Sequence, residues 1–365
     1  ILLALSQFGY ALRMGLSVVF VRAGRAHVAG AIEALSKLAG AILGMLVIWA
    51  GGSLVFAVAS LPLTSLLAAG VSWRIVHTRY CRPSLGSVRR RLLPVLRATL
   101  PFGLAEMPRL LGGRTDVLAL GLLLGPAAAG AYNAAFRIVF LLQLATHFAG
   151  VSILAEASRS AARSGQALFE LYQSALRLSL LIGVPSAAGI WLIAPKLIEL
   201  IYGAGFAESI GVLRLLAVVL LLSIFRTIIG SFVTLSGRQA RRAWMEWAAA
   251  ATMVGASLVL IPLLGLSGAA WAVGLTEALL VALFGHQMWS LGARPALGLR
   301  FAAAVLGSAA FLVAPSVLPP LPLLLEVLTC IAIYGVVIST FKAIRQDELG
   351  QLLRAVPMLP RLRRS

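Results

Sequence analysis

Long apolar runs, separated by short polar gaps, fill almost the whole sequence. Each run reaches about 20 residues, the length that an α-helix needs to cross the hydrocarbon core of a bilayer. Spanning β-strands would instead alternate over about 10 residues. The composition agrees, because only 12% of the residues are charged, whereas soluble domains carry about 25%. We therefore predict an all-α polytopic membrane protein with about eleven transmembrane helices.

The gaps between these runs alternate between basic and nearly uncharged, and this alternation predicts the topology. The positive-inside rule places arginine-rich gaps and the C-terminus in the cytoplasm. The net charge of +19 is explained by these gaps, so we do not predict nucleic-acid binding. The predicted spans are residues 1–20, 30–50, 54–76, 97–124, 128–153, 171–193, 209–234, 243–263, 266–290, 297–316 and 321–343.

The longest basic gap, residues 78–96, divides the sequence into two predicted lobes. Such a gap also attracts anionic lipid headgroups. Because the chain begins at Ile1 inside an apolar run, we expect the first helices of the N-terminal lobe to be missing. The predicted parts are the remainder of the N-terminal lobe (1–77), the connection (78–96), the C-terminal lobe (97–290), two additional helices (291–343) and a basic cytoplasmic tail (344–365).

Charged residues interrupt the fourth predicted span. Glu106, Arg109, Gly113 and Asp116 follow one another at helical spacing, which predicts a shared face. A charge at the centre of a spanning helix costs roughly 2.5–3.5 kcal/mol, so such residues normally face a bundle interior or a water-filled cavity. We interpret Asp116 and Glu106 as ion-coupling candidates. The alternative is an internal ion pair that fixes helix packing.

Four arginines, Arg13, Arg109, Arg137 and Arg226, lie within predicted spans and are candidates for substrate binding. A guanidinium stays charged and binds phosphate through a planar fork, so four of them around one cavity would suit a pyrophosphate. The alternative is that they pair with buried acids, which are Glu106, Asp116, Glu277 and Glu326. Glu33 and Glu246 lie near predicted helix ends, and we expect them at the surface.

Enzyme motifs are missing from the sequence: there is no G-x-S-x-G, P-loop or H-E-x-x-H pattern. Cys81 and Cys330 lie far apart and provide no metal-binding spacing. We therefore expect a transporter rather than an enzyme, without a metal or cofactor. With no nucleotide site, transport would be passive or coupled to an ion gradient.

Short motifs in the second half resemble those of the Wzx-type polysaccharide biosynthesis flippases, in the multidrug/oligosaccharidyl-lipid/polysaccharide (MOP) exporter superfamily. The resemblance covers about residues 97–290. The motifs are Arg114-Thr-Asp116, Leu120-Gly121, Gly125, Gly130-Ala-Tyr132, Ala134-Ala135-Phe-Arg137, Ile201-Tyr-Gly203-Ala-Gly-Phe206, Leu235-Ser-Gly237-Arg238 and Ile261-Pro-Leu-Leu-Gly265-Leu-Ser-Gly268-Ala-Ala270.

The resemblance implies a two-lobed helical bundle of the MOP/MATE type with a central cationic cavity. It implies that an undecaprenyl-pyrophosphate-linked oligosaccharide, such as an O-antigen, lipopolysaccharide or exopolysaccharide precursor, is flipped to the outer leaflet of the bacterial inner membrane. Its partners would be membrane lipids and a coupling ion, H⁺ or Na⁺. The alternatives are a multidrug/cation antiporter of the same superfamily, or a polysaccharide polymerase or ligase with a large external loop.

Overall fold

The computed structural model describes residues 2–80, 93–94, 99–100, 107–108, 111–161, 165–236 and 238–293, and positions 325, 328, 329, 332 and 334. Within these ranges every regular element is a helix, which confirms the predicted all-α class. Seven of the described helices are long and apolar enough to cross a membrane. The predicted span 297–316, nearly all of 321–343, the tail 344–365 and most of the connection 78–96 lie outside the described residues.

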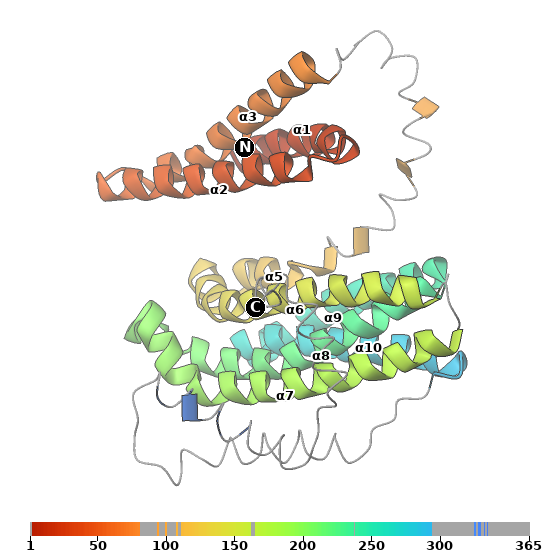
Figure 1. Cartoon of the computed structure of the whole chain (residues 1–365). Coiled ribbons are helices and arrows are strands. Elements are labelled where there is room, and N and C mark those ends of the chain that lie inside the picture. Colours follow the sequence, from red (N-terminus) through yellow and green to blue (C-terminus); the bar gives the residue numbers. More distant parts are fainter. Residues whose placement is uncertain are drawn as a thin grey trace. The chain divides into compact units, whose positions relative to one another are not determined.

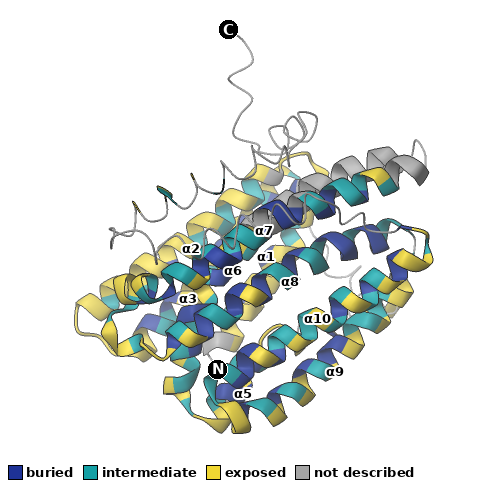
Figure 2. Ribbon diagram, turned by 90° about the horizontal axis from the view of Figure 1, so that it is seen from below, coloured by how far each residue is buried: buried dark blue, intermediate teal, exposed yellow. Residues whose placement is uncertain are grey.

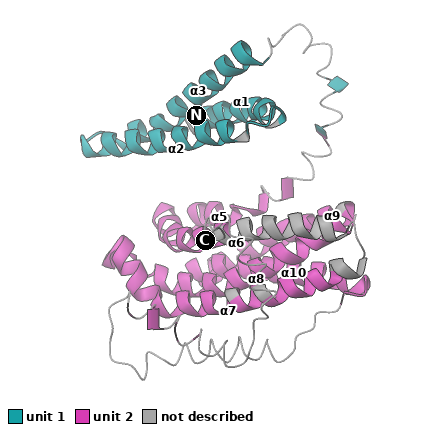
Figure 3. Cartoon of the chain, in the orientation of Figure 1, with its two compact units in different colours: residues 1–99 teal, residues 100–365 magenta. Residues whose placement is uncertain are grey.

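The chain forms two compact units, Ile1–Thr99 and Leu100–Ser365 (Figure 3). The first unit contains α1 (Leu2–Arg22), α2 (Ala26–Trp49) and α3 (Leu54–Arg79) (Figure 1). Here α3 packs against both other helices. Ser60 on α3 donates a hydrogen bond of 3.0 Å to the Gly40 carbonyl of α2. Small and hydroxyl-bearing residues at such contacts let apolar helices approach closely in a bilayer.

The second unit is built around α8 (Ser209–Leu235), which packs against α6, α7 and α10 and more lightly against α9. Its buried side chains include Leu213, Leu216, Leu220 and Phe232, and its buried surface is visible in Figure 2. The helices around it are α5 (Thr115–Leu123), α6 (Pro126–Ala161), α7 (Gly165–Tyr202), α9 (Gln239–Leu264) and α10 (Leu266–Ser290), and a 3-10 turn, η1 (Ala204–Phe206), precedes it.

Glycines make two of the tight reversals in this unit. Gly125 (φ +92°) lies between α5 and α6, and Gly265 (φ +62°) joins α9 directly to α10, because glycine adopts positive φ without steric cost. At Gly268, an added Cβ would lie 2.0 Å from the Leu260 carbonyl oxygen. Only glycine therefore fits where the start of α10 approaches the end of α9.

The helix ends differ most from the prediction in α6, which continues to Ala161 beyond the predicted residue 153, and in α7. The predicted span ended at residue 193, with an external gap over 194–208, but α7 continues to Tyr202. Pro195 and Lys196 therefore lie inside the helix and not in the predicted gap. A proline is tolerated inside a membrane helix where another group satisfies the carbonyl that it leaves free.

Gly113 and Arg114 form a turn between two helical segments. The turn interrupts the helical period on which the shared face of Glu106, Arg109 and Asp116 depended. Of these three residues, Glu106 and Arg109 lie outside the described residues.

Candidate functional site

Arg226, in the central helix α8, forms an ion pair with Glu277 of α10. Its Nε donates a hydrogen bond of 2.6 Å to Glu277 Oε2. The two side chains are 29% and 15% exposed, respectively. The pair therefore lies largely inside the second unit. The sequence left two interpretations of Arg226, substrate binding or pairing with a buried acid. The structure shows it paired with Glu277, one of the four acids named.

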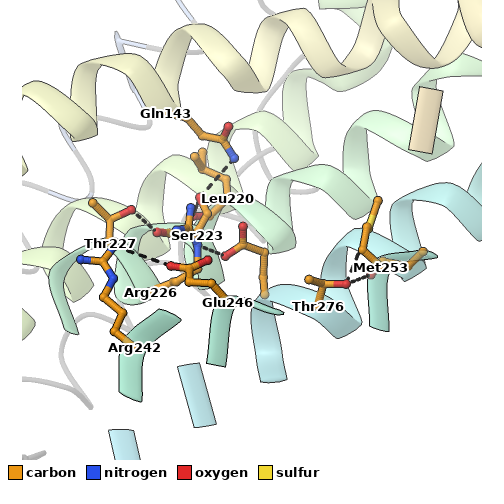
Figure 4. Close-up of polar contacts among 11 residues, drawn as sticks. Gln143, Leu220, Ser223, Arg226, Thr227, Arg242, Glu246, Met253 and Thr276 are labelled. Carbon is orange, nitrogen blue, oxygen red and sulfur yellow. Dashed lines mark hydrogen bonds and ion pairs between the residues drawn. The ribbon is translucent and has the colours of Figure 1, made fainter. Parts of the chain in front are cut away.

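A second ion pair lies next to the first, on α9. Arg242 Nη2 is 3.6 Å from Glu246 Oε1, and Glu246 also interacts electrostatically with Arg226. Two cations and two anions thus meet between α8, α9 and α10 (Figure 4), so the cluster carries no net charge. Glu246 is half-buried, and its predicted surface position was wrong because α9 begins at Gln239 and places Glu246 about two turns inside the helix.

Polar side chains continue this cluster along α8. Gln143 of α6 donates to Ser223 Oγ at 3.2 Å, and Thr227 Oγ1 donates to the Ser223 carbonyl at 2.7 Å. On α8, Arg226 and Thr227 follow Ser223 by three and four positions, so the three residues share one side of the helix. Sequence reasoning missed Gln143, although an amide inside an apolar span was the available signal.

Asp116 occupies the first turn of α5 and is only 2% exposed. Tyr132 of α6 donates its hydroxyl to Asp116 Oδ2 at 2.6 Å. The second carboxylate oxygen, Oδ1, is buried and has no hydrogen-bond partner among the described residues. A buried carboxylate with an unused oxygen agrees with the ion-coupling interpretation, which stays a prediction.

Arg114 and Arg137 lie on the exposed side of α5 and α6. Arg114 reaches α6, where its Nη1 is 3.5 Å from Asn133 Oδ1 and its guanidinium lies 4.9 Å from the centre of the Phe136 ring. Arg137 follows Asn133 by four residues and shares its face. Among the described side chains, none is hydrogen-bonded or ion-paired to Arg137. Asn133 was not singled out from the sequence.

Arg13 belongs to the first unit, where it is buried and 3.5 Å from Glu33. Glu33 also pairs with Lys37 at 2.8 Å, so it is not an isolated surface group. Of the six residues proposed from sequence, the structure therefore places three, Asp116, Arg137 and Arg226, in the second unit. It gives Arg13 and Arg226 carboxylate partners and leaves Arg137 exposed.

Charged side chains enclosed by apolar helices are typical of membrane transporters, and comparison with known structures identifies the fold. The lipid II flippase MurJ in an inward closed conformation is similar with a TM-score of 0.80 and 12% identity, over 93% of this chain and 73% of that chain. A MATE transporter in the bent conformation gives a TM-score of 0.53 and 19% identity, over 84% and 69%. An outward-facing multidrug resistance MATE transporter gives 0.50 and 18%, over 77% and 64%. The fold is that of the MOP exporters.

A family model described as polysaccharide biosynthesis protein matches residues 16–211. The chain belongs to this family, the Wzx-type flippases of the MOP superfamily. The match begins well before the motifs that suggested the family from sequence and ends before the one at residues 261–270. No curated protein matches the sequence.

Proposed function

We propose that this multi-pass transporter flips an undecaprenyl-pyrophosphate-linked oligosaccharide from the cytoplasmic to the outer leaflet of the bacterial inner membrane. It works by alternating access, is driven by a gradient of H⁺ or Na⁺ and has a cytoplasmic C-terminus. Moving a pyrophosphate through a bilayer requires a positive, hydrated path, while the polyprenyl chain can stay in lipid.

The observation that carries this proposal is the position of Arg137. It lies about three turns into α6, roughly 17 Å along the helix axis from Pro126, and a hydrocarbon core is about 30 Å thick. An exposed guanidinium at this depth is costly in lipid and normally faces a wet cavity. The Arg137 side chain is exposed, and Arg114 adds a second exposed cation on this side of the unit.

This arrangement separates the proposal from its alternatives. A cation antiporter favours excess negative charge along the path, whereas the exposed strip of α5 and α6 carries two arginines. A polymerase or ligase needs a large external loop. In the described part of the second unit, α5 and α6 are separated only by Leu124 and Gly125, and α9 and α10 only by Gly265.

The test uses purified protein in proteoliposomes and an undecaprenyl-pyrophosphate-linked sugar whose exposure in the outer leaflet is measured. We expect Arg137→Ala to lower the flipping rate about tenfold or more, because charge-assisted hydrogen bonds to phosphate are worth about 1.5–3 kcal/mol. Arg137→Lys should retain part of the activity. The control is Arg74→Ala, which removes an exposed arginine of α3. Equal rates for Arg137→Ala and wild type would refute the proposal.

A further inference from the structure

Three aromatic rings stack along α6 beside the exposed arginine. The Tyr132 and Phe136 ring centres are 6.2 Å apart at an interplanar angle of 22°. Phe136 and Phe140 repeat this geometry at 6.2 Å and 23°. Tyr132 is fully buried and Phe140 is 44% exposed. The ladder thus starts in the core of the second unit and ends at its surface.

Phe140 lies three residues after Arg137, so both side chains are on the same side of α6. This side of α6 carries a strip of polar and aromatic residues: Asn133, Phe136, Arg137 and Phe140. Arg114 lies over the Phe136 ring. A lipid-facing helix surface would instead be uniformly apolar. If Arg137 faces water, the exposed Phe140 ring faces water too. A ligand that covers this ring and also binds the cations would remove apolar surface from water.

A sugar joined to a pyrophosphate has both properties: its C–H face stacks on an aromatic ring while the adjoining phosphate binds arginine. We propose that Phe140, supported by Phe136, is a stacking subsite for the sugar next to the pyrophosphate. This inference rests on the proposed function. It adds a contact to the first sugar, by which the protein would distinguish a sugar-bearing carrier lipid from a sugar-free one.

The experiment compares binding of two lipids to detergent-solubilised protein. One is undecaprenyl pyrophosphate carrying a single N-acetylhexosamine, and the other is undecaprenyl pyrophosphate alone. Phe140→Leu keeps an apolar side chain but removes the aromatic face. We expect it to weaken binding of the sugar-bearing lipid about fivefold, the scale of an aromatic stacking contact, and to leave the sugar-free lipid unchanged. Phe56→Leu, at an exposed phenylalanine of α3, is the matched control.

Arg137→Ala should weaken binding of both lipids, which separates the phosphate contact from the sugar contact. If Phe140→Leu affects both lipids equally, or neither, the stacking subsite is refuted while the flippase proposal stands. If the wild-type protein binds neither lipid, both proposals are refuted.

A second inference concerns the two prolines inside α7, Pro185 and Pro195. A proline has no N–H, so each leaves the carbonyl four residues earlier without its helical donor. These carbonyls belong to Leu181 and Trp191, and side chains from other elements bond to both of them. Tyr334 donates its hydroxyl to the Leu181 carbonyl at 2.6 Å. Arg214 of α8 donates from Nε to the Trp191 carbonyl at 3.3 Å.

We infer that Tyr334 and Arg214 are positioning residues, because each supplies the donor that a proline removes from α7. We call each of these two sites, Pro185 with Leu181 and Pro195 with Trp191, a joint of α7. The bend of α7 is thereby linked to α8 and to the segment that carries Tyr334. Because each donor comes from outside α7, movement of either element away from α7 frees a carbonyl and loosens the helix at that joint. In alternating access, α7 would change its bend whenever these elements move.

A double-mutant cycle tests this link. Spin labels at the exposed positions 170 and 200 of α7 report its bend as a distance distribution in proteoliposomes. Tyr334→Phe removes one hydrogen bond, and we expect it to raise the population of the altered bend about fivefold. Pro185→Ala restores an N–H for the Leu181 carbonyl, so Tyr334→Phe should have no effect in that background. An equal effect in both backgrounds, or no effect in either, would refute the joint.

Discussion

Removing Glu277 from its ion pair tests whether Arg226 is held by carboxylates. Glu277→Gln leaves the Arg226 guanidinium inside the second unit with only Glu246 nearby. Breaking a fully buried pair costs about 3–5 kcal/mol, because an uncompensated charge stays behind. Since the Arg226 side chain is 29% exposed, we expect a smaller loss of about 2–3 kcal/mol in the free energy of unfolding.

The assay is reversible unfolding in mixed micelles or bicelles, with a double variant as the decisive comparison. Arg226→Met combined with Glu277→Met removes both charges, and unfolding should return to within about 1 kcal/mol of wild type, because a buried pair contributes little net stability. Glu199→Gln is the matched control, since Glu199 is exposed on α7. The reasoning fails if Glu277→Gln costs no more than Glu199→Gln, or if the double variant is no more stable than the single one.

Three further predictions follow from other contacts. Gly268→Ala should prevent stable folding or lower the free energy of unfolding by about 3 kcal/mol or more, because its Cβ would meet the Leu260 carbonyl. Thermal unfolding measures this loss. Gly255→Ala is the control and should be nearly neutral, because nothing lies within 4 Å of its added Cβ. Asp116→Asn should weaken the dependence of flipping on the ion gradient, and an unchanged dependence in proteoliposomes would remove Asp116 from ion coupling. Glu33→Gln should cost less than Glu277→Gln, about 1 kcal/mol in the same unfolding assay, because the Glu33 side chain is 34% exposed.

Hydropathy alone predicted the ends of those helices that stop at a charged residue or at a glycine. The span 266–290 coincides with α10, and 209–234 differs from α8 by one residue. It failed at Pro195, because tolerance of a proline depends on a donor from another helix, Arg214, which no local pattern reveals. Helix ends are therefore predictable where the chain itself ends the helix, and less so where a tertiary contact prolongs it.

The candidate site shows the same division. The sequence identified Arg226 as a charge within a span and gave Glu277 as one of four candidate partner acids. The choice among them depended on how α8 and α10 pack, which only the structure shows. Glu246 was misplaced because the start of α9 was predicted too late. Arg137 was predicted as a charge within a span, and its exposure on α6 depends on how the neighbouring helices pack, which no local pattern specifies.

The close approach at Gly268 has a mechanical consequence. With no room for even a methyl group against the Leu260 carbonyl, and a one-residue reversal at Gly265, α9 and α10 form a hairpin that is stiff at this end. Glu246 lies on α9 and Glu277 lies on α10, the two helices of that hairpin. If the hairpin tilts away from α8, both carboxylates move away from Arg226 together. The positive charge of Arg226 would then be left without its two acidic neighbours.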